Sequence, residues 1–226
     1  MPAQPTSPNF FLDGKKKSER VWNATDARGA QIIVASGYDG LDDAVFGFST
    51  EAQFEDWLAS KPVTTHEYSK GKAILDRTPK RLTEEAEKTL SEYQANAIKK
   101  YKADFEALLS QARIPRQDPD ALTEFVTNYN PQKGPNVHSA FLYDGTGFMG
   151  SWIYLPKGWS YNKLSWFNFN DKCSSIRVYF GGAILCEHTH FGGRKVGAFG
   201  YPAKEVKDLG VFPFYFNNTA SSVFTW

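Results

Sequence analysis

The hexapeptide NDKCSS, residues 170–175, decides what the C-terminal part of this chain can be. It has two amide or carboxylate side chains, a gap of two residues, and two hydroxyls. The same side-chain types recur 47 residues later in NNTASS, residues 217–222. A single copy is typical of a polar turn, because Asn, Asp and Ser commonly hydrogen-bond to their own backbone. Two copies indicate an internal repeat.

The repeat also includes a segment that precedes each hexapeptide. In the first copy the pattern aromatic-x4-aromatic-x-Gly is formed by Tyr143, Phe148 and Gly150. In the second copy the same spacing is formed by Cys186, Phe191 and Gly193. The Phe of each pattern precedes the last Ser of its hexapeptide by 27 residues in the first copy and by 31 in the second. Two half-domain units that bury their apolar faces against each other are predicted.

These patterns resemble the signature of the βγ-crystallin family, and in particular of its microbial calcium-binding members. That signature is a folded hairpin followed by [ND][ND]xx[ST]S in each Greek-key motif. Both hexapeptides match the second part in full, whereas Cys186 departs from the aromatic residue that usually begins the hairpin. The resemblance covers about residues 138–226, roughly 40% of the chain, and implies an all-β double Greek-key sandwich there.

The resemblance also implies two calcium sites, each combining one loop with the hairpin of the other motif. The first is expected to use Asn170, Asp171, the Lys172 carbonyl and Ser174, with the second hairpin near Glu187. The second is expected to use Asn217, Asn218, the Thr219 carbonyl and Ser221, with the first hairpin near Asp144. Calcium prefers six to eight hard oxygen ligands, and water would complete the shell. Since the first site would gather two carboxylates, we expect it to be the tighter.

A competing pattern for zinc lies at the start of the second hairpin. Cys186, His188 and His190 would project to one face if the segment were extended, and thiolate and imidazole are zinc ligands. The hairpin of the family folds back on itself, however, which breaks this alternation. No fourth ligand or general base is evident, so zinc is the weaker interpretation.

The N-terminal part combines strand-like runs with helical periodicity, which predicts an α/β domain over residues 21–130. Residues 31–35 and 45–48 are short β-branched or aromatic runs around a turn, and predict two strands. Thr50 and Gln53 form a capping-box pattern before an amphipathic helix of about ten residues. Residues 1–20 are rich in Pro, Ser and Lys and are predicted to be a flexible segment. The overall class is therefore α+β, with the domain boundary in the linker before residue 138.

A long helix is predicted from Glu84 to Arg113. Thr83 can cap its start and Pro115 ends it. The apolar stripe expected to face the core consists of Ala86, Leu90, Tyr93, Ala97, Tyr101, Phe105, Leu108 and Ala112. The polar face, expected to be solvated, carries Lys88, Lys99, Lys100, Lys102 and Asp104.

The nearly balanced charge of the chain argues against binding of a charged partner through overall electrostatic attraction. Lys and Arg number 26 against 25 Asp and Glu, so no global field favours nucleic acid or an anionic membrane. The chain begins without the apolar run of a secretory signal, and no stretch approaches the roughly 20 apolar residues that span a bilayer. We expect a cytoplasmic protein with free thiols at its two cysteines, and leave secretion open.

The sequence therefore predicts a non-enzymatic calcium-binding protein in which calcium stabilises or switches the C-terminal domain. The predicted partners are calcium ions and a protein that binds the N-terminal domain, with no nucleic acid and no membrane. The alternative is a protein inhibitor or toxin-like effector built on the same fold, although such proteins usually carry a signal peptide and disulfides. No Gly-x-Ser-x-Gly elbow or phosphate-binding glycine loop indicates an enzyme.

Overall fold

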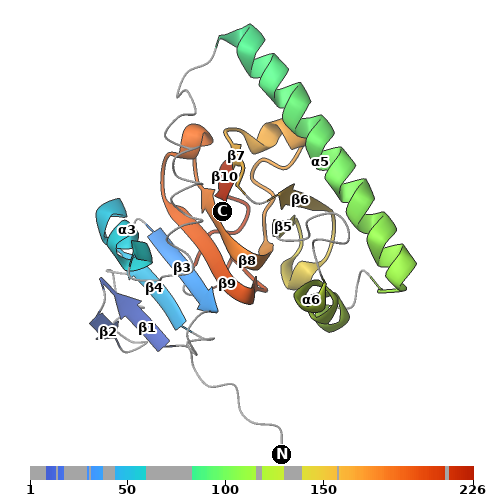
Figure 1. Cartoon of the computed structure of the whole chain (residues 1–226). Coiled ribbons are helices and arrows are strands. Elements are labelled where there is room, and N and C mark those ends of the chain that lie inside the picture. Colours follow the sequence, from blue (N-terminus) through green and yellow to red (C-terminus); the bar gives the residue numbers. More distant parts are fainter. Residues whose placement is uncertain are drawn as a thin grey trace, which may run out of the picture.

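The computed structural model describes residues 9–13, 15–17, 30, 32–37, 44–59, 83–115, 119–129, 139–156, 158–211 and 214–226. In these residues three helices, α3 (Glu51–Ala59), α5 (Glu84–Ala112) and α6 (Pro119–Asn128), lie beside a curled sheet of ten strands (Figure 1). The predicted α+β class is confirmed.

The C-terminal half of the sheet is built around two long strands. Its strands are β5 (Ser139–Tyr143), β6 (Trp152–Pro156), β7 (Ser160–Tyr161), β8 (Ser175–Cys186), β9 (Lys195–Val206) and β10 (Ser222–Thr225). β8 and β9 pair antiparallel, with a register shift between Tyr179 and Gly181. Phe180 has a φ of 53° at this shift, so β8 is bent there. β5 pairs with β8 before the bend and with β6, whereas β10 pairs with β8 after the bend and with β7.

The N-terminal strands extend this same sheet. They are β1 (Asn9–Leu12), β2 (Lys15–Lys17), β3 (Ile32–Gly37) and β4 (Ala44–Phe48), and their spatial order is β2-β1-β4-β3. β3 and β4 pair antiparallel, as expected for the two predicted strands, and β3 pairs in parallel with β9. The sheet of the predicted N-terminal domain is therefore continuous with the C-terminal one. Residues 9–12 and 15–17, predicted within a flexible segment, are paired strands.

Helix α3 covers the N-terminal strands with aromatic side chains. Its capping box forms as predicted, because Thr50 N donates to Gln53 Oε1 at 2.9 Å and Gln53 N donates to Thr50 Oγ1 at 3.3 Å. Phe54 packs on Phe48 with ring centroids 5.4 Å apart, and Trp57 packs on Phe46 at 4.8 Å. Phe199 of β9 and Trp226 belong to the same buried cluster, so this helix also anchors the junction of the two halves.

Helix α5 has the predicted ends but a different buried face. Thr83 Oγ1 accepts a hydrogen bond from Ala86 N at 3.3 Å, and Arg113 ends the helix with a φ of 57°. The buried residues are Gln94, Ile98, Phe105 and Leu109. Tyr93, expected in the core, is 63% exposed. Lys102, expected in solvent, lies 4.4 Å from the Trp152 ring centroid and donates to the Trp152 carbonyl at 3.1 Å. Phe105 is buried as predicted, whereas the other buried residues are each displaced by one position from the predicted Tyr93, Ala97 and Leu108.

Helix α6 was not predicted from the sequence. Leu122 and Val126, four residues apart, are buried in the aromatic cluster that also contains Phe105 and Phe141. Pro119 stands at its first position, where a missing N–H costs nothing. With α5 it covers the β5 and β6 side of the sheet (Figure 1).

The end of the chain packs closely on β8. A Cβ added at Gly182 would lie 2.0 Å from Cζ2 of Trp226, whose indole is 2% exposed. We expect Gly182→Ala to lower the free energy of unfolding by about 2–3 kcal/mol, because the ring must move out of a filled core. Gly192→Ala is the matched control, since its Cβ would meet nothing closer than 3.4 Å. Urea unfolding of both variants tests this, and equal losses would contradict the packing argument.

Candidate metal centre

The two hexapeptide loops lie against each other and exchange backbone hydrogen bonds. Asp171 N donates to Ala220 O at 2.9 Å, and Asn218 N donates to Cys173 O at 3.1 Å. Asp171 and Asn218 are the second residues of their loops, and both adopt the left-handed conformation, with φ of 52° and 54°. Asn and Asp tolerate this conformation better than other non-glycine residues. The loops are thus related by an internal two-fold and form one unit.

Each hairpin is closed by its own carboxylate. Asp144 Oδ1 accepts a hydrogen bond from Ser151 N at 2.6 Å, and Glu187 Oε2 accepts one from Arg194 N at 3.0 Å. The glycine of the pattern is required by this closure, because a Cβ at Gly150 would lie 2.1 Å from Asp144 Oδ1, and Gly150 has a φ of 78°. Of the three carboxylates predicted at the calcium sites, Asp144 and Glu187 therefore make hydrogen bonds within their own hairpins.

The last serine of each loop ties it to the hairpin of the same motif. Ser175 Oγ donates to Gly145 O at 2.7 Å, and Ser222 Oγ donates to His188 O at 2.6 Å. These are equivalent bonds under the internal two-fold. Each loop therefore lies on its own hairpin, and this holds for both motifs.

The hydroxyl of Ser174 lies at the centre of a cluster of oxygen atoms. It is 2.9 Å from the Asp144 carbonyl, 3.2 Å from Asn218 Oδ1 and 3.4 Å from the Lys172 carbonyl. A hydroxyl has one proton, so it can donate to only one of these three acceptors. At least two of the three acceptor oxygens therefore receive no hydrogen bond from this hydroxyl. Such a set of carbonyl, amide and hydroxyl oxygens suits a hard cation such as calcium.

Ser221 occupies the equivalent position in the second motif. Its hydroxyl lies 3.2 Å from Asp171 Oδ1, while Asp171 Oδ2 accepts a hydrogen bond from Asn170 Nδ2 at 2.6 Å. Under the internal two-fold, the carbonyls of Glu187 and Thr219 correspond to those of Asp144 and Lys172. The charge of Asp171 thus lies at Ser221, whereas the Ser174 cluster receives the neutral amide of Asn218.

For the serines, the contacts in the structure differ from the predicted pairing of loops and hairpins, which stays a prediction for calcium itself. We expected the first loop to work with the hairpin near Glu187 and the second with the hairpin near Asp144. Instead, Ser174 contacts the Asp144 carbonyl of its own motif, and the side chains that reach a serine of the other motif are those of Asp171 and Asn218. The physical reason is the tie between each last serine and its own hairpin.

The first residue of each loop stands beside its cluster. Asn170 binds the Asp171 carboxylate, and the Asn217 carbonyl accepts a hydrogen bond from Thr219 Oγ1 at 3.0 Å. The sequence analysis named the hairpin near Asp144 but not the atom, because a pattern of side chains gives no signal for a backbone oxygen; in the structure it is the Asp144 carbonyl that lies 2.9 Å from the Ser174 hydroxyl.

The zinc pattern is not assembled. His190 and Phe191 have φ of 57° and 63°, so the hairpin turns back immediately after His188. Within the described part of the chain, no group of three or more His, Cys, Asp or Glu side chains is arranged to hold a metal. Cys186 is fully buried, and this burial raises the pKa of its thiol to about 12 although Lys195 opposes the shift. A zinc-binding thiolate is therefore disfavoured there.

No protein-family model matches this chain, and no curated protein matches it. Solved βγ-crystallin domains are similar to part of the chain. One from Ciona intestinalis is 24% identical and covers 39% of this chain and 99% of its own, with a TM-score of 0.34. An archaeal one is 24% identical (40% and 100% covered, TM-score 0.33), and one from Flavobacterium johnsoniae is 22% identical (38% and 91%, TM-score 0.31).

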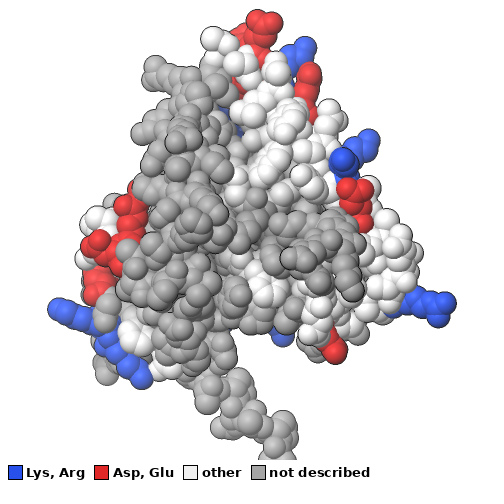
Figure 2. Space-filling model, in the orientation of Figure 1, with Lys and Arg blue, Asp and Glu red and all other residues white. Residues whose placement is uncertain are grey.

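The two hairpins, the two loops and their internal two-fold confirm the βγ-crystallin-like domain expected from the sequence. None of the helices described is both long and apolar enough to cross a membrane. On the face shown in Figure 2, acidic and basic side chains are interspersed on the described surface, without a large area of one sign. The interpretation of the site therefore rests on its local oxygen chemistry.

The buried thiol of Cys186 predicts a pH dependence. Its pKa is raised from 9.0 to about 12, so its contribution to stability is complete below pH 9 and is lost as pH rises toward 12. Between pH 9 and 10 the wild type should lose about 1 kcal/mol of unfolding free energy beyond what Cys186→Ala loses. Urea unfolding at pH 8, 9 and 10 measures this difference, and parallel pH profiles for the two proteins would contradict it.

Proposed function

We propose that this chain is a non-enzymatic calcium-binding protein with two sites in its βγ-crystallin-like domain, and that calcium stabilises the folded domain. The observation that carries the proposal is the cluster of acceptor oxygens around Ser174. Four oxygens of four different residues converge there, and a single hydroxyl proton cannot satisfy them all.

The donor sets fit calcium in kind. The first site would be held by Ser174, Asn218 and the carbonyls of Asp144 and Lys172. The second would be held by Ser221, Asp171 and the carbonyls of Glu187 and Thr219. All are hard oxygen donors, and calcium accepts irregular sets of six to eight with water supplying the remainder.

The surroundings of the two serines favour binding over catalysis. Among the described residues, the hydrogen-bonding neighbours of the Ser174 and Ser221 hydroxyls are all oxygen atoms. A nucleophilic serine needs an adjacent base, usually an imidazole or amine nitrogen. This observation supports a binding role for both serines.

Each site draws on both motifs, so an ion held there would join the two halves of the domain. A ligand that binds the folded state alone stabilises it by mass action, by about 2.7 kcal/mol when its concentration is 100 times the dissociation constant. The proposed role of calcium is therefore to hold the loops together where their oxygens would otherwise repel one another.

Calorimetry of the full chain should show two calcium ions bound. Ser174→Ala and Ser221→Ala should each remove or strongly weaken one of them, because each serine supplies a central ligand to one site. Calcium at millimolar concentration should raise the melting temperature of the wild type. Ser165→Ala, at an exposed position outside both loops, is the control and should retain both ions. Absence of any binding, with an unchanged melting temperature, would refute the proposal.

The charges predict the order of affinity: the site that holds the Asp171 carboxylate should be the tighter one, as expected from the sequence, but it is the site of Ser221 rather than that of Ser174. The site around Ser221 includes the Asp171 carboxylate, whereas the site around Ser174 includes only neutral side chains. Asp171→Asn should therefore weaken the tighter site by about three- to tenfold, since ligand charge tunes calcium affinity. Asn218→Asp is the reciprocal variant and should tighten the weaker site. Calorimetry in which Asp171→Asn affects only the weaker event would contradict this order.

A further inference from the structure

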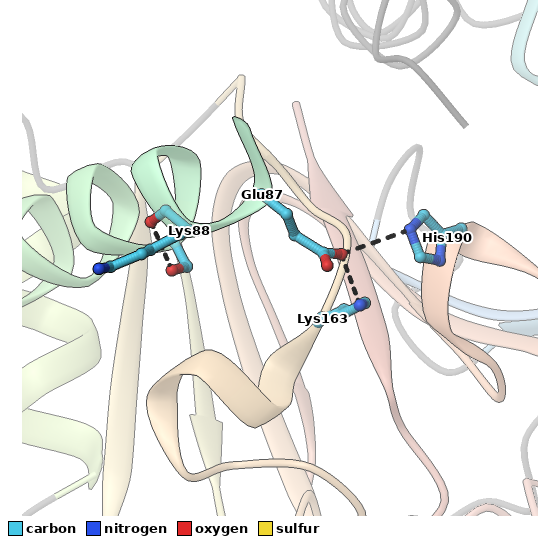
Figure 3. A network of polar contacts seen from close by, with 5 residues as sticks. Glu87, Lys88, Lys163 and His190 are labelled. Carbon is cyan, nitrogen blue, oxygen red and sulfur yellow. Dashed lines mark hydrogen bonds and ion pairs between the residues drawn. The ribbon is translucent and has the colours of Figure 1, made fainter. Parts of the chain in front are cut away.

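The N-terminal end of helix α5 contacts the second hairpin through a small polar network (Figure 3). Glu87 Oε1 lies 2.5 Å from Lys163 Nζ and 4.0 Å from His190 Nε2. His190 is part of the short helix η4 (Thr189–Phe191) in the turn of that hairpin. Lys88, the next residue of the helix, points away from the network (Figure 3). Glu87 therefore joins α5 to both the hairpin and the segment that contains Lys163.

A second polar contact lies two turns further along α5. Gln94 is 5% exposed, and its Nε2 donates to the Ser160 carbonyl at 2.8 Å. Glu87 and Gln94 thus bind the two ends of the same short segment, residues 160–163. Tyr93 adds a stacked contact with Trp159, whose ring centroid is 5.7 Å away. The N-terminal half of α5 is docked on this segment by charge, hydrogen bonding and aromatic stacking.

The same segment is bonded directly to the second candidate calcium site. His190 N donates to the Asn162 carbonyl at 2.9 Å, which joins the segment to the second hairpin. Leu164 N donates to the Ser221 carbonyl at 2.8 Å, which joins it to the second loop. Lys163, the partner of Glu87, is the residue between Asn162 and Leu164, and Ser160, the partner of Gln94, is two residues before Asn162. A displacement of α5 would therefore be transmitted through the backbone of residues 160–164 to Ser221, which supplies the hydroxyl of the second site.

The internal two-fold provides a site without these ties. In the first motif the equivalent bonds are Gly147 N to Lys207 O at 2.7 Å and Leu209 N to Ser174 O at 2.9 Å. For residues 207–209, none of the polar contacts within the described structure reaches α5.

Among the described residues, helix α5 meets the first hairpin and β6 through its C-terminal half: Lys102 contacts Trp152, and Phe105 borders a cavity of about 120 Å³ whose walls are mainly aromatic and include Phe148. Phe105 lies roughly 27 Å along the helix from Glu87, at 1.5 Å per residue. A change at Glu87 is therefore local to the second site.

We infer that helix α5 regulates the second site selectively: docking of its N-terminal half and calcium binding at Ser221 stabilise each other, while the site at Ser174 is independent of that docking. The inference rests on the proposed function, since it needs calcium to bind. Coupling between two sites is reciprocal, so whatever docking adds to calcium affinity, calcium adds to docking. A partner that captured the N-terminal half of α5 would accordingly release calcium from one site and leave the other loaded.

The test measures calcium affinity of the full chain in two backgrounds, each with one site disabled. Ser174→Ala leaves the Ser221 site, and Ser221→Ala leaves the Ser174 site. Glu87→Gln should weaken calcium binding about two- to fivefold in the first background, as expected for loss of a partly exposed ion pair, and should leave the second unchanged.

Glu85→Gln is the matched control. It removes the same charge from the same helical turn, so it changes the helix dipole interaction equally, but Glu85 is exposed and lies outside the network. This control should have no effect in either background.

Hydrogen exchange gives the reciprocal measurement. Calcium should slow amide exchange in residues 84–98 of the Ser174→Ala protein and should not do so in the Ser221→Ala protein. Gln94→Ala, which removes the buried hydrogen bond, should reduce this protection. Equal effects of Glu87→Gln at both sites, or no effect at either together with unchanged exchange, would overturn the inference while leaving calcium binding intact. No calcium binding by the wild type would overturn the proposed function and the inference together.

Discussion

The bend of β8 at Phe180 is the constraint on which the rest of the structure depends. A straight strand of this length would place its ends roughly 40 Å apart. Yet Ser175 at its start is the last residue of the first loop, and Cys186 at its end pairs with Ser222, the last residue of the second loop. The two loops share hydrogen bonds. The bend brings both ends to one place. β9 pairs with β8 along one edge and with β3 along the other, so the N-terminal strands continue the sheet.

The candidate sites follow from this arrangement because neither motif contains a complete one. At Ser174 the first motif supplies a hairpin carbonyl, a loop carbonyl and the hydroxyl, and the second motif supplies the Asn218 side chain; at Ser221 the side chain that crosses is that of Asp171. An ion bound there would connect the motifs at the point where acceptor oxygens already face one another. Among the described residues, the polar contacts of helix α5 reach the surroundings of the Ser221 site and not those of the Ser174 site. The calcium affinities of two nearly symmetric loops can therefore respond differently to a displacement of this helix.

Local features were predictable from the sequence where a short stretch determines them by itself. Thr83 and Pro115 define the ends of α5, and the Thr50 and Gln53 capping box forms as predicted, because these signals act within one helical turn. The buried face of α5 was not predictable in this way. Tyr93 is apolar enough for the core and Gln94 is not, but Gln94 donates a hydrogen bond to the carbonyl of Ser160, which lies 66 residues away in the chain. Apolar periodicity contains no information about such a partner.

The sequence by itself determined that two equivalent loops exist, which residues they contain, and that Asp171 distinguishes one from the other. Only the tertiary structure decided which site receives that charge. The reason is geometric: the last serine of each loop binds its own hairpin, so the second residue of the loop is the part left to reach across the two-fold. The contact of Glu87 with Lys163 and His190 was likewise decided in three dimensions, because it joins side chains that are 76 and 103 residues apart in the chain.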